Sequence, residues 1–269
     1  MTYRKPYWPF RSCLAPGGFL SLTALGLVSV WLASPHCLSA AEAPLSGDRV
    51  PASQGEIIIH PVNHASLVLG WNKLVIYVDP VGGAPRFAGL PRADLVLLTD
   101  IHGDHLSAET LKAVAAAKST LLAPAAVAEQ LPADLRQRTT ILTNGQQVSL
   151  LGLQVEAIPA YNLAAERLKF HAKGRGNGYV LSLGGKRIYL SGDTEDIPEM
   201  RALKDIDVAF VCMNLPYTME VKQAAEAVRA FRPKIVYPYH YRGSDLEQFK
   251  KLVNEQAGIE VRVRDWYGR

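Results

Sequence analysis

Two stretches of this chain repeat one pattern and so limit the folds that it can adopt. An apolar run ending in aspartate occurs over residues 73–79 (KLVIYVD) and again over residues 186–193 (KRIYLSGD). About twenty residues after each comes an apolar run that begins with aspartate, over residues 94–98 and 207–211. Two similar halves can pack sheet on sheet and leave helices for the outer faces. The repeat predicts an α/β fold, a four-layer αββα sandwich in which strand-end loops of both halves meet along one edge. The alternative is a coincidence between common strand patterns.

Strand and helix patterns alternate through the chain. Short runs rich in Val, Ile and Leu, bounded by Gly, Pro or Asn, predict strands over residues 56–59, 66–69, 73–78, 94–99, 154–158, 179–183, 187–191, 208–212 and 234–237. Helices are expected over residues 108–117, with Ser107 as N-cap, and over residues 220–231 and 245–256. No low-complexity linker interrupts this order, so residues 44–269 are expected to form a single domain.

The first 43 residues have the pattern of a secretory signal peptide. Three basic residues, Arg4, Lys5 and Arg11, precede an apolar run over residues 19–33, and small residues near Ala43 offer a cleavage site. The alternative is an uncleaved membrane anchor, although the run is shorter than the roughly 20 residues that a spanning helix needs. We therefore expect an exported, periplasmic protein.

Charge and cysteine content exclude two further features. The formal net charge is +4, and three of these charges lie in the leader, so the mature chain is nearly neutral. Nucleic-acid binding requires a strongly basic face, so the expected partner is a small-molecule substrate, with membrane contact only through an uncleaved leader. Cys212 is the single cysteine beyond the leader region, which excludes an internal disulfide in the mature chain.

Residues 99–105 (TDIHGDH) follow a predicted buried strand and concentrate possible metal ligands. Asp100, His102, Asp104 and His105 lie within six residues, and Gly103 allows a tight turn between the histidines. Desolvating these groups at the end of a strand is costly unless a cation pairs with them. Neutral imidazole and carboxylate suit zinc, iron or manganese. The turn therefore predicts a metal site.

The motifs, taken in order, carry a resemblance to a known family. The chain resembles the metallo-β-lactamase fold hydrolases, in particular the small metal-dependent hydrolases related to the L-ascorbate-6-phosphate lactonases, over residues 57–267. The motifs that carry it are His64-Ala65-Ser66, Asp79-Pro80, the turn at residues 100–105, Ala157-Ile158-Pro159-Ala160-Tyr161-Asn162, Ser191-Gly192-Asp193-Thr194, Pro216-Tyr217-Thr218-Met219 and Pro238-Tyr239-His240-Tyr241.

The resemblance implies two divalent metal ions, with zinc first and manganese or iron as alternatives. The implied metal ligands are Asp100, His102, Asp104, His105, His171, Asp193 and His240, and Asp104 and Asp193 also have implied catalytic roles. In the family's H-x-H-x-D-H motif the first position is histidine, whereas this chain has Asp100. Asn162 stands where the family has its middle histidine, so His171 is a candidate replacement; the alternative is a solvated loop histidine. If neither Asp100 nor His171 binds, the site holds one ion.

Five further residues are candidates for contacting substrate: His60, His64, Tyr217, Tyr241 and Arg242. The alternative for the two histidines is to cap a tight turn, and for the other three to pack the rim. Lys169, Lys173 and Arg175 could steady an anionic substrate, or could belong to a surface loop. Asp79 is expected to orient a ligating imidazole.

The predicted function is hydrolysis by a metal-activated water of an ester, lactone, amide or phosphodiester in a small molecule. Three alternatives remain at this level. A phospholipase-D-like phosphodiesterase acting on lipids would need an exposed apolar rim near the site. A redox di-iron role suits carboxylate-rich ligation. A non-catalytic metal- or ligand-binding protein of the same fold would follow if Asp100 and Asn162 disable turnover.

Overall fold

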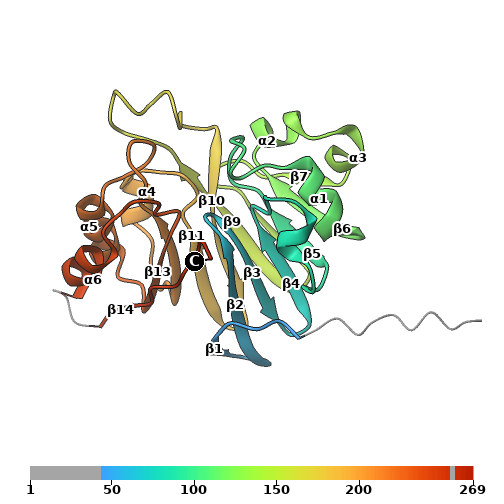
Figure 1. Ribbon diagram of the computed structural model, residues 1–269, viewed down its shortest axis with the longest axis horizontal. Helices are drawn as coiled ribbons and strands as arrows, with labels where there is room; N and C mark the ends of the chain where they lie inside the picture. Colours follow the sequence, from blue (N-terminus) through green and yellow to red (C-terminus); the bar gives the residue numbers. More distant parts are fainter. Residues whose placement is uncertain (1–43, 255–257, 269) are drawn as a thin grey trace, which may run out of the picture. The chain divides into compact units, whose positions relative to one another are not determined.

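Two seven-stranded sheets face each other at the centre of the computed structural model, which describes residues 44–254 and 258–268. Helices cover the outer face of each sheet (Figure 1). The predicted four-layer αββα arrangement is therefore confirmed. The predicted leader lies outside the described residues. Among the described residues no helix has the length and apolar character needed to cross a membrane.

The first sheet is built in chain order from seven strands. They are β1 (Asp48–Ala52), β2 (Gly55–Asn63), β3 (Ser66–Trp71), β4 (Leu74–Val78), β5 (Ala93–Leu97), β6 (Ala115–Ala123) and β7 (Thr139–Ile141). Strands β1 to β4 pair antiparallel, and β4 to β7 pair parallel. The ends of β2, β4 and β5 consequently lie at one edge of the sheet.

The second sheet repeats this order of antiparallel and then parallel strands. It contains β8 (Gln147–Leu150), β9 (Leu153–Ala160), β10 (Gly176–Leu183), β11 (Lys186–Leu190), β12 (Val208–Cys212), β13 (Ile235–Tyr239) and β14 (Glu260–Val261). Strands β8 to β11 pair antiparallel, and β11 to β14 pair parallel. The internal repeat seen in the sequence thus corresponds to β4–β5 in one sheet and β11–β12 in the other.

Equivalent side chains make equivalent bonds where these strand pairs begin. Asp94 accepts a hydrogen bond from the Val75 amide at 3.0 Å, and Asp207 accepts one from the Arg187 amide at 2.9 Å. In both sheets the aspartate at the start of one strand holds the preceding strand in register. Asp94 and Asp207, which begin the second run of each repeat, are therefore structural.

The far ends of the two strand pairs are also alike. The Thr99 amide donates to Asp79 at 2.8 Å, and the Cys212 amide donates to the Ser191 hydroxyl at 3.1 Å. In each pair, a side chain directly after the first strand thus binds the backbone at the end of the second strand. These exits carry the residues described below.

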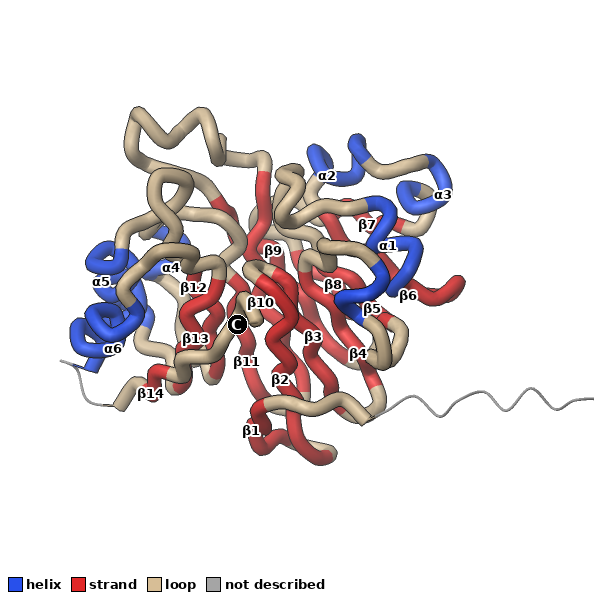
Figure 2. Tube along the Cα trace, in the orientation of Figure 1, coloured by secondary structure: helices blue, strands red, loops and turns tan. Residues whose placement is uncertain are grey.

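The core lies between the sheets, with a second cluster beneath the helices of the first sheet. Along β2, β3 and β4 buried residues alternate between the two, as the two-residue period of a strand requires: Leu67 and Leu69 face the second sheet, whereas Val68 joins the outer cluster. The first sheet is covered by α1 (Ala108–Val114), α2 (Ala125–Gln130) and α3 (Ala133–Arg136), with a 3-10 turn, η1, at Ala84–Phe87. The second carries α4 (Pro198–Arg201), α5 (Val221–Phe231) and α6 (Leu246–Asn254) (Figure 2).

The helices predicted over residues 108–117 and 245–256 correspond to α1 and α6, whose bounds differ from the prediction. Ser107 caps α1 as predicted, accepting a hydrogen bond from the Thr110 amide at 3.2 Å. The helix nevertheless ends at Val114 instead of residue 117, because Ala115 is the first residue of β6 and pairs with Ala93 of β5. Helix α6 is described to Asn254, and the rest of its predicted range lies outside the described residues.

Candidate metal centre

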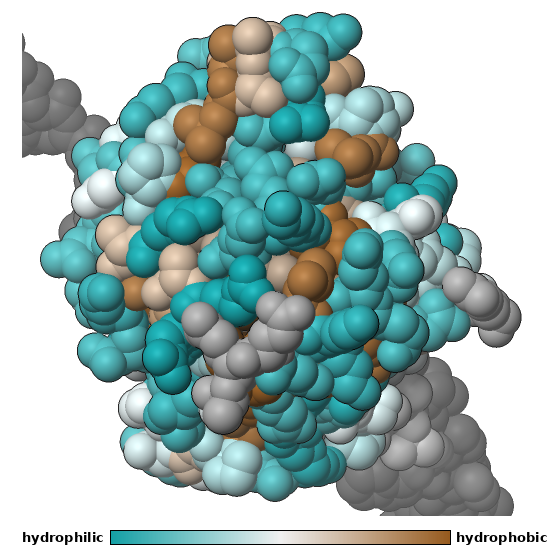
Figure 3. Space-filling view, turned by 90° about the vertical axis from the view of Figure 1, so that its left-hand side faces the viewer, coloured by the Kyte–Doolittle hydropathy of each residue, from teal (hydrophilic) through white to brown (hydrophobic). Residues whose placement is uncertain are grey.

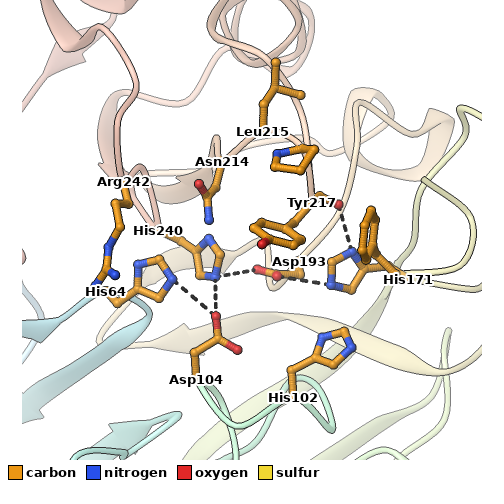
Figure 4. Close-up of a pocket in the computed structure, with 12 residues that line it drawn as sticks. His64, His102, Asp104, His171, Asp193, Asn214, Leu215, Tyr217, His240 and Arg242 are labelled. Atoms are coloured by element: carbon orange, nitrogen blue, oxygen red, sulfur yellow. Dashed lines mark hydrogen bonds and ion pairs between the residues drawn. The ribbon is translucent and has the colours of Figure 1, made fainter. Parts of the chain in front are cut away.

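The predicted metal ligands gather at the sheet edge where β2, β5, β11 and β13 end. A cavity of about 750 Å³ opens there (Figure 4). Its lining residues are His64, His102, Asp104, Phe170, His171, Asp193, Asn214, Leu215, Pro216, Tyr217, His240 and Arg242. The strand-end loops of both sheets therefore meet in one site, as the repeat predicted.

A network around Asp79 shapes the turn after β5. The carboxylate binds the Thr99 amide and accepts a hydrogen bond from His105 Nδ1 at 2.8 Å, so His105 Nε2 points away from it. The turn closes where the His105 amide donates to the His102 carbonyl at 2.9 Å. Burial raises the pKa of Asp79. Although burial alone would lower the pKa of His105, the charges of Asp193 and Asp79 raise it well above its ordinary value. This excess of negative charge around a buried imidazole would equally favour a metal cation.

Five side chains form a group that we call the Asp104 centre: His64, Asp104, His105, Asp193 and His240. Nε2 of His64 and Nε2 of His240 each lie 3.3 Å from Asp104 Oδ2. Nε2 of His240 and Nε2 of His105 each lie 3.4 Å from Asp193 Oδ1. Burial would raise the pKa of Asp104, but the contacts with His240 and His64 lower it well below its usual range, so this carboxylate is ionised.

A second group, the His102 centre, lies on the other side of Asp193. Potential ligand atoms of Asp100, His102 and His171 lie within 4.8 Å of one another. His171 Nε2 is 3.1 Å from Asp193 Oδ2, and His102 Nδ1 is 3.5 Å from Asp100 Oδ1. Asp193 thus turns one oxygen to each centre. Burial opposes its ionisation, yet His240 and His105 hold its pKa well below the usual range.

The imidazoles are oriented by contacts to their other ring nitrogens. His64 Nδ1 lies 2.7 Å from the Tyr267 hydroxyl, and His171 Nδ1 lies 3.2 Å from the Tyr217 carbonyl. Burial lowers the pKa of His64, which favours the neutral ring that a metal requires. Such contacts are typical of histidines that bind metal through the opposite nitrogen.

Three buried atoms that face the centres make ion-pair contacts of 3.1–3.4 Å but no hydrogen bond among the described residues. They are His105 Nε2, His171 Nε2 and Asp193 Oδ1. Unpartnered buried polar atoms are costly and rare in proteins. Nitrogen and carboxylate oxygen are the donors that zinc, manganese and iron accept. The residues present therefore fit divalent metal ions.

Left-handed backbone conformations concentrate at the site. His64 has a φ of 52°, Asp79 of 42° and His240 of 47°, which is uncommon for residues other than glycine. The His240 amide donates to the His64 carbonyl at 3.1 Å, and the His64 amide donates to the Trp266 carbonyl at 3.0 Å. These bonds between distant loops hold the strained residues in place, as is common at functional sites.

Asp100, the departure from the family motif, is paired with an arginine. Arg175 Nη2 lies 3.3 Å from Asp100 Oδ1 and 3.2 Å from Oδ2. The pair is buried on its acidic side, with 3% of the Asp100 side chain exposed. Lys173 in the same loop lies 3.1 Å from Glu199. Because both cations already have carboxylate partners, the expectation that they steady a substrate is not supported.

His171 enters the site because its loop folds around Asn162. The Asn162 amide donates to the His171 carbonyl at 2.9 Å, and its Nδ2 donates to the Tyr217 carbonyl at 2.7 Å. Glu195 fixes the start of the loop by accepting from the amides of Leu163 and Ala164 at 2.8 and 2.9 Å. His171 has 1% of its surface exposed, so the alternative of a solvated loop histidine is wrong.

Comparison with known families decides the class of the protein. A family profile described as "Beta-lactamase superfamily domain" matches residues 59–240. The chain belongs to the metallo-β-lactamase superfamily. A UPF0173 metal-dependent hydrolase of Thermococcus onnurineus is 32% identical over 216 residues, covering 74% of this chain and 93% of that protein. One from Pyrococcus abyssi is 29% identical over 215 residues, with the same coverage. The chain is thus a UPF0173-type metal-dependent hydrolase.

Several solved structures share the fold. A protein of Parabacteroides distasonis, assigned as a metal-dependent hydrolase, is 39% identical with a TM-score of 0.76, covering 84% of this chain and 100% of that one. Igni18, a metallo hydrolase of Ignicoccus hospitalis, is 22% identical with a TM-score of 0.66, covering 79% and 96%. CmlA, a diiron β-hydroxylase of Streptomyces venezuelae, is 19% identical with a TM-score of 0.57, covering 80% and 53%. The last two likenesses concern the fold alone.

Two of the candidate substrate contacts do not line the cavity of this hydrolase. His60 Nδ1 lies 2.7 Å from the Ser46 carbonyl, where β2 meets the chain before β1. The Tyr241 hydroxyl donates to the Arg264 carbonyl at 2.9 Å, and its side chain lines a neighbouring hollow. The expectation that these two residues face the substrate is therefore corrected. His64, Tyr217 and Arg242 do line the cavity.

Several site residues were not among the predicted ones. Phe170, Asn214, Leu215 and Pro216 line the cavity, and Tyr267 supports His64 from the end of the chain. Pro216 lies in a quoted motif and the other three cavity residues lie close to predicted residues or motifs, so proximity in sequence was the available signal. Tyr267 lies 203 residues from His64, and nothing in the sequence pairs them.

Proposed function

We propose that this enzyme hydrolyses an ester, lactone, amide or phosphodiester of a small molecule with two divalent metal ions, zinc foremost. One observation carries the proposal: Asp193 turns its two oxygens to two separate groups of imidazoles and carboxylates. A carboxylate placed between two such groups can bridge two cations. The proposed ligands are Asp104, His105 and His240 at one centre and Asp100, His102 and His171 at the other, with Asp193 shared.

Asp104 and His64 have different proposed roles in the reaction. Divalent ions, when bound, lower the pKa of a coordinated water and polarise the scissile bond. Asp104 is suited to orient the attacking water, because its side chain is 45% exposed to the cavity and both histidine contacts at 3.3 Å use Oδ2. Its Oδ1 lies 3.9 Å from His105 Nε2 and is the freer oxygen. His64 holds Asp104 on the cavity wall.

The His102 centre is proposed to hold its ion less tightly. Asp100 shares its charge with Arg175, and hydrogen bonds from the Ile101 and His102 amides further engage its Oδ1. A carboxylate already bound by an arginine has less charge to give to a metal. We therefore expect the Asp104 centre to fill first on titration.

A hydrolysis panel tests the proposed function. Purified protein would be assayed on soluble esters, lactones, amides and phosphodiesters as isolated, after chelation, and after zinc, manganese or iron(II) is restored. We expect hydrolysis of at least one class, its loss on chelation and its return with metal. Asp104→Asn, which keeps the shape, should lower kcat about 100-fold or more. An undiminished rate after complete removal of metal would refute the proposal.

A second candidate, a phosphodiesterase acting on lipids, is favoured by one specific feature. Exposed apolar side chains stand on the two loops beside the cavity: Leu163 (48%), Leu168 (46%), Leu215 (49%) and Tyr217 (47%). This is the apolar rim that the candidate requires. Figure 3 views the molecule from the side of α5 and α6, where the surface is mostly hydrophilic and apolar surface extends to the upper edge. Hydrolysis of phospholipid in vesicles, with no activity on soluble diesters, would select this candidate.

Two finer expectations also remain proposals. Export to the periplasm through cleavage near residue 43 would be tested by N-terminal sequencing of protein from a periplasmic extract. A phosphorylated lactone, as the lactonase resemblance implies, belongs in the panel as one substrate. The UPF0173 relatives from Thermococcus onnurineus and Pyrococcus abyssi carry only the general name of metal-dependent hydrolase.

A further inference from the structure

We propose that the substrate is an acidic small molecule with an apolar arm: a carboxylate or phosphate binds Arg242, and an alkyl or aryl arm packs across the cavity on Phe170, Leu215, Pro216 and Tyr217. This inference rests on the proposed function, because it names the substrate class of the same cavity. The volume of about 750 Å³ suits a ligand of this size.

The apolar side of the cavity is a preformed wall. The rings of Phe170 and Tyr217 meet edge to face, with centroids 5.1 Å apart at 75°. Leu215 continues this surface above the metal ligands (Figure 4), and Pro216, the next residue, also lines the cavity. The wall is anchored from behind, because Asn162 Nδ2 donates to the Tyr217 carbonyl at 2.7 Å.

The exposure of the apolar side chains in this wall favours a ligand that covers them. Leu215 and Tyr217 are about half exposed, at 49% and 47%, although both line the cavity that holds the proposed metal ligands. Covering apolar surface contributes about 25 cal/mol per Å². An alkyl or aryl group that lies on these side chains would therefore gain affinity, whereas a purely polar substrate would leave the wall unused.

Arg242 supplies the opposite end of the recognition. It is the one lysine or arginine among the cavity-lining residues, and its guanidinium lies over the Tyr267 ring, 5.3 Å from the ring centroid. Among the described residues it has no carboxylate partner, in contrast to Arg175 and Lys173. A guanidinium stacked on an aromatic ring keeps its N–H groups free for a carboxylate or phosphate.

The two features lie on opposite sides of the metal ligands. Arg242 stands beside His64, at the Asp104 centre (Figure 4). Phe170 also lines the cavity and directly precedes His171 of the His102 centre in the sequence. A molecule that contacts both ends must cross Asp193, which lies between the centres. The scissile bond of such a substrate would thus lie between its anionic end and its apolar arm.

Binding measurements test this without requiring turnover. Zinc-loaded full-length protein would be titrated calorimetrically with 4-phenylbutyrate, with its neutral amide 4-phenylbutyramide, and with acetate. We expect 4-phenylbutyrate to bind about tenfold more tightly than 4-phenylbutyramide and about tenfold more tightly than acetate. The amide lacks the charged contact with Arg242 and acetate lacks the apolar contact with the wall, and the loss of either is expected to weaken binding about tenfold. Arg242→Met should remove the preference for the acid over the amide, and Leu215→Ser the preference for phenylbutyrate over acetate.

Lys118→Met is the matched control for the charge change. Lys118 is exposed on β6 and does not line the cavity, so this variant should bind like the wild type. Equal affinity of the wild type for 4-phenylbutyrate and for its amide would overturn the proposal. The proposal would also be overturned if Arg242→Met bound 4-phenylbutyrate as tightly as the wild type, because the acid would then contact only the metals. Failure of the hydrolysis panel with this preference intact would refute the proposed function and leave the substrate class standing.

Discussion

At the scale of single residues, the hydrogen-bond partner of one imidazole nitrogen determines the direction in which the other nitrogen points. Asp79 holds Nδ1 of His105, and the Tyr267 hydroxyl holds Nδ1 of His64, so that both Nε2 atoms face the carboxylates of the Asp104 centre. Tyr267 has a second task, because its hydroxyl accepts a hydrogen bond from the Tyr241 amide at 3.1 Å. The last described residues of the chain thus help to assemble the metal site.

Tyr267→Phe should weaken metal binding without unfolding the protein. The ring remains to stack with Arg242, but His64 loses the partner that fixes its orientation. Because His64 in turn positions the proposed ligand Asp104, we expect the loss of this hydrogen bond, worth about 1 kcal/mol, to lower zinc affinity about fivefold. Competition with a chromophoric chelator measures this. Tyr237→Phe, whose hydroxyl donates to Asp48 instead of an imidazole, is the control, and equal zinc affinity in both variants would contradict the role assigned to Tyr267.

At the scale of the elements, the same strand pairing is used twice to bring ligands to one edge. The pair β4–β5 ends at Asp79 and the turn of residues 99–105, and the pair β11–β12 ends at Asp193 and the loop of Asn214. Each pair is locked where it starts and where it ends. The distance between the two sets of ligands therefore depends on how the two sheets pack.

Asp207→Asn should destabilise the fold in a pH-dependent way. Burial would raise the pKa of Asp207, but hydrogen bonds from Lys234 and the Arg187 amide lower it below its ordinary value. A lowered folded-state pKa stabilises the protein above the unfolded-state pKa, and this stabilisation is lost as pH falls through the folded-state value. We expect a loss of about 1–2 kcal/mol at pH 7 that shrinks below about pH 4.

Denaturant unfolding of both proteins across pH measures this difference. Asp205→Asn, at an exposed position on the loop before β12, is the control and should change stability by less than about 0.5 kcal/mol. A difference between wild type and Asp207→Asn that stays constant from pH 7 to pH 3 would show that the carboxylate charge is not the cause.

Gly192→Ala should damage both stability and metal retention. Gly192 has a φ of 61°, and an added Cβ would lie 2.8 Å from the Asn177 carbonyl oxygen. Gly89 also has a positive φ, 79°, but nothing lies within 4 Å of the added atom, so Gly89→Ala isolates the backbone strain. We expect about 1–2 kcal/mol lost for Gly89→Ala and about 1–3 kcal/mol more for Gly192→Ala.

Unfolding free energies and bound zinc measure the effect of the glycine variants. Because Gly192 precedes Asp193, its variant should also release metal. Equal losses of stability in the two variants, with zinc retained in both, would contradict the close approach of β10 and the Gly192 turn.

Strands with apolar runs could be predicted from the sequence, whereas elements defined by their neighbours could not. Strands β4, β5, β11 and β12 were predicted because each is a buried run of Val, Ile, Leu or Phe. Strand β6 begins with three alanines, which favour a helix, and forms through pairing with β5. The short strands β1, β7, β8 and β14 at or near the sheet margins have too little pattern to detect.

The site was predictable where ligands share a motif. His102, Asp104 and His105 follow from one turn, but the place of His171 depends on Asn162 and Glu195, which hold a loop that has no regular pattern. The pairing of Asp100 with Arg175 also joins residues 75 positions apart. Such contacts depend on tertiary packing and leave no local trace.

At the scale of the whole molecule, each half contributes part of the site. The first sheet and its loops supply His64 and the turn of residues 99–105, while the second supplies His171, Asp193 and His240. Neither half contains a complete centre with Asp193. Metal binding is therefore expected to stabilise the packing of the two sheets, because a ligand that binds only the folded state shifts the folding equilibrium.

Removing residues 1–43 should leave the fold and the metal content unchanged. The described residues contain both hydrophobic clusters, and Leu45, at 8% exposure, already packs in the outer one. Thermal unfolding by circular dichroism and elemental analysis would compare residues 44–269 with the full chain. A longer deletion serves as the control: residues 64–269 also lack β1 and β2 and should not fold. Loss of metal in residues 44–269 would contradict the single-domain assignment.

The number of ions held by the purified protein tests the central claim most directly. Elemental analysis after equilibrium dialysis against zinc should give about two ions per chain for the wild type and about one for His171→Ala, whose imidazole lies 3.1 Å from Asp193 in the His102 centre. Asp193→Asn should retain less than the wild type, because both centres share this carboxylate. A wild-type protein that binds no zinc, manganese or iron(II) would contradict the account.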